Sequence, residues 1–245
     1  VAVKQEGIQP KNNAGNPMAF DGSGDYLEVL DLNWKPTVFT IEWWHKAKTF
    51  KNYNQSIGNG WGSFLVHASS DGALNIGVAN NTASRMIIPN AFTDVNTWHH
   101  YAYTFNNGVA KVYRDGKLMA SKTASSLPPN WQTFKIGGSD GNSIDGEIDE
   151  FRMWTTEKSQ QQIRENMHLT ATGAEADLKL YLQFQNAANT VVDISNNSYK
   201  VALFGNTVRD TSFVPVAKGI SETKQITAAG LTDYSQVGVA LQFSG

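Results

Sequence analysis

The chain has 245 residues, of which 40% are hydrophobic and 11% aromatic, so it is long enough to bury a substantial core. Its 20 basic and 22 acidic residues leave a formal charge of -2, which gives no electrostatic reason to expect nucleic acid or an anionic membrane as a partner. The absence of cysteine excludes disulfides, zinc–thiolate sites and cysteine nucleophiles, whereas a glycan or a protein surface remains open as a partner.

The first predicted elements are a turn and a long strand. The segment FDGSGDYLEV (20–29) is typical of a tight Asp/Gly turn that opens into a strand. Residues 38–48 alternate cleanly between two kinds of side chain, which predicts a strand with one core face. That expected core face carries Phe39, Ile41, Trp43, His45 and Ala47. The polar segment 49–62, which contains several aromatic residues, is expected to be a loop.

Hairpin signals dominate the middle of the chain. Asp71-Gly72 separates two short strand-like segments, 63–69 and 73–79, and so predicts a β-hairpin. Three consecutive antiparallel strands, joined by turns that supply a positive φ, are then predicted at 98–105, 109–114 and 117–121.

The last third of the chain contains the one predicted helix. The proline-containing segment 125–131 is expected to be a surface connection before a strand at 133–136. Residues 155–167 carry a Thr cap, an early acid and helical apolar spacing. Strands are expected again at 178–184 and 199–204. Regularly spaced short strands with a single short helix predict an all-β fold, an antiparallel two-sheet β-sandwich.

The two ends of the sequence differ in amino-acid composition from its middle. We expect one domain over 1–215, ordered from about residue 18, and a C-terminal extension or the start of a neighbouring domain over 216–245, with a strand at 237–243. No stretch approaches the roughly 20 apolar residues of a membrane span, so membrane insertion is not expected. Because the chain begins with Val1, we expect a processed form or part of a larger multidomain chain.

A glycine-rich turn leading into one acidic strand carries most of the chemically interesting residues. Unbroken alternation predicts two faces for the strand. One carries Ile144, Gly146, Ile148, Glu150 and Arg152. The other carries Asp145, Glu147, Asp149, Phe151 and Met153. Three acids therefore crowd around position 149.

Several segments, taken in order, resemble a known family. They are FDGSGDYLEV (20–29), FTIEWW (39–44), NTWHHYAYTF (96–105), VYRDGKLMA (112–120), IGG with GEIDEFRMW (136–154) and the tail at 175–205. Together they are similar to a laminin G-like jelly roll, of the bacterial surface-protein type, in the concanavalin A-like lectin/glucanase superfamily. The resemblance implies a jelly-roll sandwich that is secreted or displayed on a cell surface.

The resemblance makes the acidic strand a candidate for glycan cleavage, since hydrolases of this superfamily present Glu-x-Asp-x-Glu or a bulged variant on one strand. That chemistry needs two carboxyl groups that flank one glycosidic bond. Glu147 and Asp149 would share a face, but position 151 is Phe and position 152 is Arg. The catalytic pair is missing, so we predict no catalytic residue and no enzyme.

The resemblance also implies a structural Ca²⁺, which many members hold between an N-terminal turn and an Asp of a late strand. The matching positions are Asp21 and Asp149, with Asp25 and the carbonyls of Gly22 or Gly24 as helpers. The alternative is that these residues cap turns. The two-calcium ligand site of pentraxins is not expected, because the corresponding loop is short and has a single acid.

Aromatic residues in loops are the candidate ligand-binding residues, because sugar rings stack on exposed aromatic faces while neighbouring amides bind hydroxyls. The candidates are Tyr53, Asn59, Trp61 and Trp131, and the alternative is that they pack against the rim of the sandwich. Trp44 is assigned a structural role.

These observations predict a non-catalytic binding module for carbohydrate recognition or adhesion, whose partner is a glycan or a cell-surface protein. One alternative is a ligand-free spacer domain of a large surface adhesin. The other is a glycan-cleaving enzyme.

Overall fold

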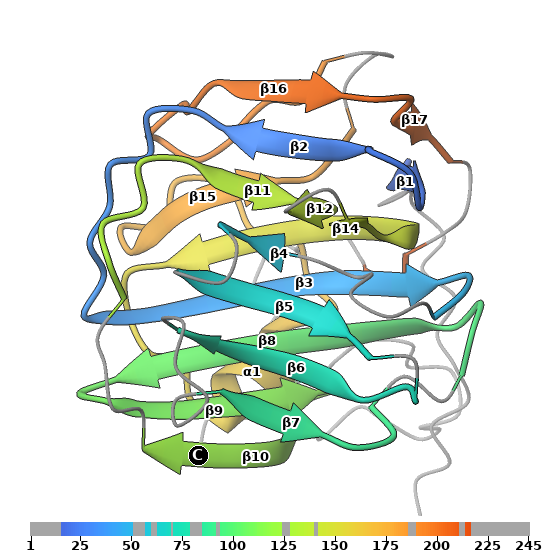
Figure 1. Cartoon of the computed structure of the whole chain (residues 1–245). Coiled ribbons are helices and arrows are strands. Elements are labelled where there is room, and N and C mark those ends of the chain that lie inside the picture. The colour runs from blue at the N-terminus through green and yellow to red at the C-terminus, as the bar shows by residue number, and fades with distance from the viewer. Residues whose placement is uncertain are drawn as a thin grey trace, which may run out of the picture.

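Two antiparallel β-sheets lie face to face (Figure 1). The computed structural model describes residues 16–50, 57–59, 63–69, 71–78, 85–91, 94–123, 128–139, 142–185, 190–210 and 214–216. Within these residues every strand pairing between named strands is antiparallel, which confirms the predicted two-sheet sandwich. The helices of the described residues include none long and apolar enough to cross a membrane.

The back sheet of Figure 1 has the strand order β10-β9-β8-β3-β14-β1-β17, with β15 also paired to β14. Its strands are β1 (Met18–Asp21), β3 (Val38–Ala47), β8 (Trp98–Asn106), β9 (Val109–Arg114), β10 (Lys117–Thr123), β14 (Asp145–Trp154), β15 (Leu178–Leu182) and β17 (Val208–Arg209). The predicted run of three antiparallel strands is β8, β9 and β10, and it is confirmed.

The front sheet has the order β16-β2-β11-β4-β5-β6-β7. Its strands are β2 (Tyr26–Val29), β4 (Ile57–Gly58), β5 (Phe64–Ala68), β6 (Leu74–Val78), β7 (Met86–Ile88), β11 (Phe134–Ile136) and β16 (Val201–Phe204). The hairpin predicted at Asp71-Gly72 joins β5 to β6. A separate small pair, β12 (Gly138–Ser139) and β13 (Asn142–Ser143), follows β11.

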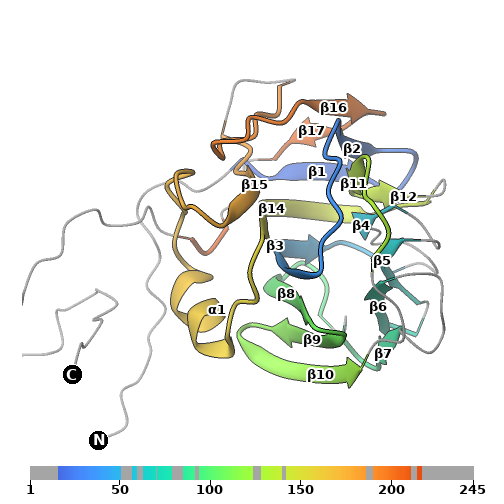
Figure 2. The same ribbon diagram turned by 90° about the vertical axis from the view of Figure 1, so that its left-hand side faces the viewer.

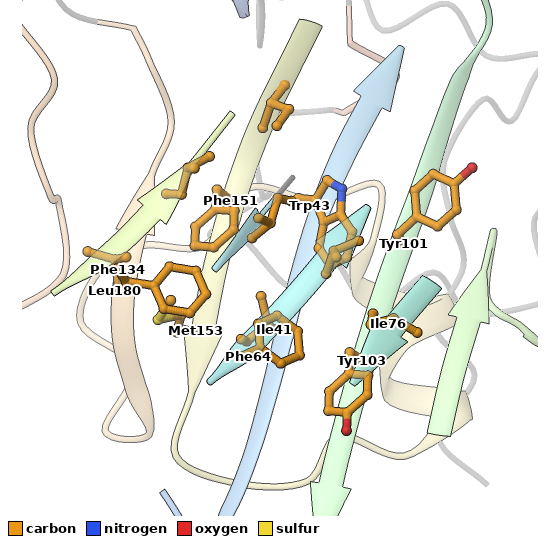
Figure 3. Packing of buried hydrophobic residues seen from close by; sticks show 14 of the residues in the cluster. Ile41, Trp43, Phe64, Ile76, Tyr101, Tyr103, Phe134, Phe151, Met153 and Leu180 are labelled. Carbon is orange, nitrogen blue, oxygen red and sulfur yellow. The ribbon is translucent and has the colours of Figure 1, made fainter. Parts of the chain in front are cut away.

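The core lies between the sheets, where their inner side chains interdigitate (Figure 3). Phe39, Ile41 and Trp43 from β3 are at most 2% exposed, as their alternation predicts. Phe64 from β5 packs against Tyr103 from β8 with a ring-centroid distance of 5.1 Å, so aromatic contacts connect the two layers.

The outer face of the back sheet is covered by the chain that follows β14 (Figure 2). Helix α1 (Gln160–Asn166) places Ile163 against Ala102 and Tyr113 of that face. Farther along the sheet Trp44 is buried under Val214 and Val216, and its Nε1 donates to the carbonyl of Met167 at 2.8 Å. The structural role predicted for Trp44 is confirmed. The strand predicted at 237–243 lies outside the described residues.

Helix α1 begins five residues later than the predicted Thr155. Its N-cap is Ser159, which forms a capping box with Gln162. Thr155 and Thr156 bond to Asp177 instead, the first through its backbone N–H to the Asp177 carbonyl at 2.8 Å. The predicted Thr cap is therefore wrong, because these threonines fix the connection to the strand that follows the helix.

Candidate functional site

The acids of β14 lie around a β-bulge. The register with β3 shifts between Asp149 and Arg152, and Glu150 adopts a φ of 52°. The extra residue reverses the pleat, so Phe151 joins Ile148 in the core while Glu150 binds groups on the outer face. The prediction of unbroken alternation through position 149 is therefore wrong.

Glu150 belongs to a buried charged network on the outer face of the back sheet. Arg152 is ion-paired with Glu150, and its Nη1 lies 3.5 Å from Oε1 of Glu42. The Tyr181 hydroxyl donates to Glu150, and Trp154 Nε1 donates to Glu42 at 2.9 Å. Burial raises the pKa of Glu42, but contacts with a histidine, an arginine and an indole outweigh burial and lower this pKa to about 2. These acids therefore serve structural pairing.

Glu147 is also paired, through lysines of β3 and the residue after it. Its Oε2 lies 2.8 Å from Nζ of Lys46, and its Oε1 lies 3.8 Å from Nζ of Lys48. The side chain of Glu147 is only 1% exposed. The acidic strand thus uses its carboxylates to bind neighbouring cations, and Phe151 faces the core.

Asp149 and Asp21 are not brought together. In the pairing of β1 with β14, Asp21 lies opposite Asp145, and Met18 lies opposite Ile148. Asp149 is therefore four residues away from Asp145, about 13 Å along an extended strand. The calcium clamp predicted from these two acids does not fit this register. Within the described residues, no group of three or more His, Asp or Glu side chains could hold a metal ion.

The bulge buries Asp149 completely. Its Oδ1 accepts the N–H of Glu150 at 2.7 Å. Burial, with the neighbouring carboxylate of Glu150, raises the pKa of Asp149 well above its usual range, while the hydrogen bond from the Glu150 N–H and the charges of Arg209 and Arg152 lower it. Calcium binding stays a prediction, and the turn that contains Asp21 is the part of the predicted site that remains a candidate for it.

That turn, residues 21–25, carries the chain from β1 in the back sheet to β2 in the front sheet, and Asp25 holds it. Asp25 is completely buried, and its Oδ2 accepts the N–H of Asp21 at 2.9 Å. Asp21 in turn accepts the N–H of Ser23 at 2.8 Å. The four predicted calcium residues of this turn, Asp21, Gly22, Gly24 and Asp25, are therefore placed together, and the two acids cap turns as the alternative stated.

Asp25 also fixes a second turn, which follows β16. Its Oδ1 accepts the N–H of Asn206 at 2.5 Å. Gly205 has a φ of 78°, and a Cβ added there would lie 2.2 Å from Oδ1 of Asp25, so only glycine fits. The two turns consequently meet at one end of the front sheet, beside Phe204.

Phe204 is the aromatic member of the exposed large hydrophobic residues that the structure describes, and it is 38% exposed. It lies in the edge strand β16 opposite Tyr26 of β2, and the two rings stack at 4.4 Å with an interplanar angle of 9°. Lys135 of β11 places its Nζ 5.1 Å from the centroid of the Tyr26 ring. Because β2 lies between β16 and β11, Phe204 and Lys135 approach the Tyr26 ring from opposite sides, and Phe204 itself lies on the edge strand of the front sheet.

We call Tyr26, Lys135, Phe204 and the turns 21–25 and 205–206 the Phe204 corner; its strands β16 and β2 lie at the top of Figure 1. Its exposed polar residues are Asp21, Ser23 and Asn206. The sequence reasoning missed this corner. The missing information was the pairing of Tyr26 with Phe204, which come from opposite ends of the chain.

The predicted ligand-binding residues have other positions. Trp131 is completely buried, and its backbone forms an antiparallel bridge with Trp34 that turns the ring into the core. Its expected surface position is therefore wrong. Asn59 is half-buried and structural, because it donates to the Thr133 carbonyl and accepts the N–H of Lys135 at 3.3 Å. The remaining candidates, Tyr53 and Trp61, lie outside the described residues.

Solved structures share this architecture at low sequence identity. A candidate carbohydrate binding protein from Bacteroides ovatus ATCC 8483 superposes with a TM-score of 0.66 at 19% identity over 83% of this chain, which spans 62% of that protein. A native heptameric SAP-like pentraxin from Limulus polyphemus superposes with a TM-score of 0.52 at 16% identity, over 63% of this chain and 82% of the pentraxin chain. At these identities the likeness concerns the fold alone.

Sequence comparison gives no match among curated proteins. A family model, Laminin_G_3, described as the concanavalin A-like lectin/glucanases superfamily, matches residues 21–164. This match runs from the turn held by Asp25, through both sheets, to helix α1. The chain therefore belongs to the laminin G-like (Laminin_G_3) family of the concanavalin A-like lectin/glucanase superfamily.

Proposed function

We propose that the protein is a non-catalytic carbohydrate-binding module that holds a sugar at the Phe204 corner. The observation that carries the proposal is the exposed outer face of Phe204, backed by Tyr26 and bordered by polar turn residues. The family supports a carbohydrate ligand, and so does the fold shared with the Bacteroides ovatus candidate carbohydrate binding protein.

The chemistry of the corner suits a sugar ring. The C–H face of a pyranose packs on an aromatic ring, while its hydroxyls need donors and acceptors around the ring. Asn206 offers a side-chain amide, Ser23 a hydroxyl and Asp21 a carboxylate. Asp25 keeps the two turns that carry these groups in register, so little ordering is needed on binding.

The non-catalytic part of the proposal rests on the acidic strand. Hydrolases of this superfamily carry their catalytic acids in this region. Here Glu147 is ion-paired with Lys46, and Glu150 is ion-paired with Arg152. They belong to the back sheet, whereas Phe204 belongs to the front sheet. We further propose that the module acts outside the cell, on secreted or cell-surface glycans in a binding or adhesion role, which is typical of this domain type.

A binding experiment with two matched variants tests the proposal. Wild type, Phe204→Ala and Ile87→Ala are compared on an array of plant and animal oligosaccharides, and the hits are then measured by titration calorimetry. Ile87 is a suitable control because it is 60% exposed at the opposite edge of the same sheet, in β7. We expect Phe204→Ala to weaken binding about tenfold or more, which corresponds to the binding free energy of one aromatic contact. Ile87→Ala should bind like wild type.

Two outcomes contradict the proposal. If wild type binds no glycan, the spacer alternative is favoured. If wild type binds but Phe204→Ala binds equally well, the ligand site lies elsewhere. A Phe204→Tyr variant separates loss of stacking from loss of folding, since it keeps the ring and should retain binding.

A further inference from the structure

The rim of the Phe204 corner is acidic. Asp21 is exposed at the turn, and its cross-strand partner Asp145 is half-buried. Glu28 follows Tyr26 by two residues on the same face of β2 and is also half-buried. Three carboxylates with access to solvent therefore lie on the turn 21–25, on the β14 residue paired with that turn and on β2 beside Tyr26, in addition to the buried Asp25; the carboxylate of Asp145 also accepts the hydroxyl of Thr49 at 2.5 Å.

The nearest cations only partly offset these acids. Lys135, the one cation of the corner as defined above, lies over Tyr26 and is the cross-strand neighbour of Glu28. Lys48 lies 3.8 Å from Glu147 of the back sheet. Directly before β16 the next cation is Lys200, which precedes Phe204 by four residues and is therefore about 13 Å away along the extended chain.

Arg209, in the short strand after the second turn, is also directed away from the rim. Its Nη2 donates to the Thr190 carbonyl at 2.6 Å, and its guanidinium lies 5.4 Å from the ring of Phe184. Lys48 also lies beside Asp145, whose carbonyl accepts the N–H of Lys48 at 2.8 Å. Asp21, Asp145, Glu28 and the buried Asp25 therefore stand against Lys135, Lys48 and Lys200, which leaves the corner with one net negative charge.

We propose, on the basis of the proposed carbohydrate function, that the Phe204 corner selects neutral sugars and rejects sugars that carry a carboxylate or sulfate. The rim acids can accept hydrogen bonds from sugar hydroxyls, but they repel a ligand anion placed among them. Like charges repel over roughly a Debye length, about 8 Å at physiological salt, and we expect the acids of the corner to disfavour a ligand carboxylate on Phe204 about tenfold.

The experiment uses matched pairs of probes that differ by an acidic group. One pair is lactose and 3′-sialyllactose, and another is galactan fragments and galacturonan fragments. Each pair is tested on three proteins: wild type, the double variant Asp21→Asn/Glu28→Gln and the control Asp71→Asn. Asp21→Asn keeps the oxygen that caps the N–H of Ser23. Asp71 makes a similar turn cap, to the N–H of Ala73, at the far hairpin of the front sheet.

We expect wild type and Asp71→Asn to bind the neutral member of each recognised pair about tenfold more tightly than the acidic member at 50 mM salt. The double variant should narrow this ratio to about twofold or less, and 500 mM salt should narrow it in wild type. Equal or tighter binding of acidic probes by wild type would overturn the inference, as would an unchanged ratio in the double variant.

The failure of the inference can be distinguished from failure of the proposed function. Acidic probes that bind wild type as well as neutral ones, and lose binding in Phe204→Ala, would overturn only the charge selectivity. Absence of binding to every probe, or binding that does not depend on Phe204, would overturn both.

Discussion

Asp25 joins two turns that lie far apart in the sequence: its Oδ1 accepts the N–H of Asn206 at 2.5 Å, and its Oδ2 accepts the N–H of Asp21 at 2.9 Å. The carboxylate is completely buried. A single side chain thus satisfies two backbone donors and positions Phe204 relative to the polar turn residues. The corner is a consequence of this one buried acid.

Replacing Asp25 by Ala should destabilise the domain and weaken glycan binding together. Two N–H groups lose a charged acceptor, at about 1–3 kcal/mol each, so we expect the melting temperature to fall by about 5–15 °C. Calorimetry and titration with a recognised glycan measure both effects. The control is Glu165→Ala, whose side chain is exposed on α1 and contacts Gln161, and it should cost less than about 0.5 kcal/mol. Equal losses in the two variants would contradict the role assigned to Asp25.

Periodicity was sufficient to predict most of this fold. Alternation identified the core face of β3, and the Asp-Gly and Asn-Gly turns identified the hairpins, because these signals depend on residues adjacent in sequence. Trp131 shows where this reasoning fails. Its proline-rich neighbourhood indicated a surface loop, but a bridge to Trp34, which lies about a hundred residues earlier, turns the ring inward.

The candidate site was harder to predict because it depends on pairings and on one bulge. The positive φ of Glu150 has no sequence signal, since glycine is the residue expected at such a conformation. The resemblance paired Asp21 with Asp149, whereas the register pairs Asp21 with Asp145. Likewise, only the pairing of β16 with β2 reveals the aromatic stack. Local patterns predict elements, and long-range register determines which side chains meet.

The Phe204 corner should recognise one sugar ring rather than a chain. Tyr26 is covered by Phe204 on one face and by Lys135 on the other, so the corner offers a single stacking surface. We expect the dissociation constant of a recognised glycan to change less than about threefold as the probe grows from a disaccharide to a hexasaccharide, since additional rings find no second platform. Titration calorimetry with a length series measures this. An affinity that rises tenfold or more with length would indicate an extended site.

Arg152→Met should be strongly destabilising, because it leaves Glu42 and Glu150 buried without their cation. Removing one partner of a buried ion pair costs about 3–5 kcal/mol. The control is Lys111→Met, which breaks the more exposed pair with Glu157 and should cost about 0–1 kcal/mol. Urea denaturation of both variants gives the comparison, and similar losses would show that the buried network contributes no more than a surface pair.

Calcium dependence provides a test of the corrected register. If the turn after β1 holds Ca²⁺, a calcium-induced rise in melting temperature should disappear in Asp21→Asn and persist in Asp149→Asn, because Asp149 lies about 13 Å away along β14 and is completely buried. Melts of the three proteins in CaCl₂ and in EGTA measure the rise. Its loss in both Asp21→Asn and Asp149→Asn would restore the clamp predicted from the resemblance.

The buried carboxyl of Asp149 should make stability depend on pH. Burial and the adjacent Glu150 raise its pKa well above the usual range, against the weaker opposing influence of Arg209 and Arg152. The folded state therefore keeps a proton that the unfolded chain has lost, so this contribution to stability is greatest below the unfolded pKa and declines as pH rises toward the folded one. Asp149→Asn mimics the protonated acid and should remove that decline.

Other groups do not obscure this test when the two proteins are compared at each pH. Because the pKa of Glu42 is lowered from 4.5 to about 2, its contribution to stability is full above the unfolded value and is lost as pH falls through the folded one, which lies below the pH range of this test. The pKa of His67 is lowered by burial, so its contribution is lost as pH falls below its unfolded pKa, but it is common to both proteins. Measured by urea denaturation from pH 5 to pH 8, the stability of Asp149→Asn minus that of wild type should therefore grow steadily. Parallel profiles for Asp149→Asn and wild type would show that Asp149 is ionised in the folded protein.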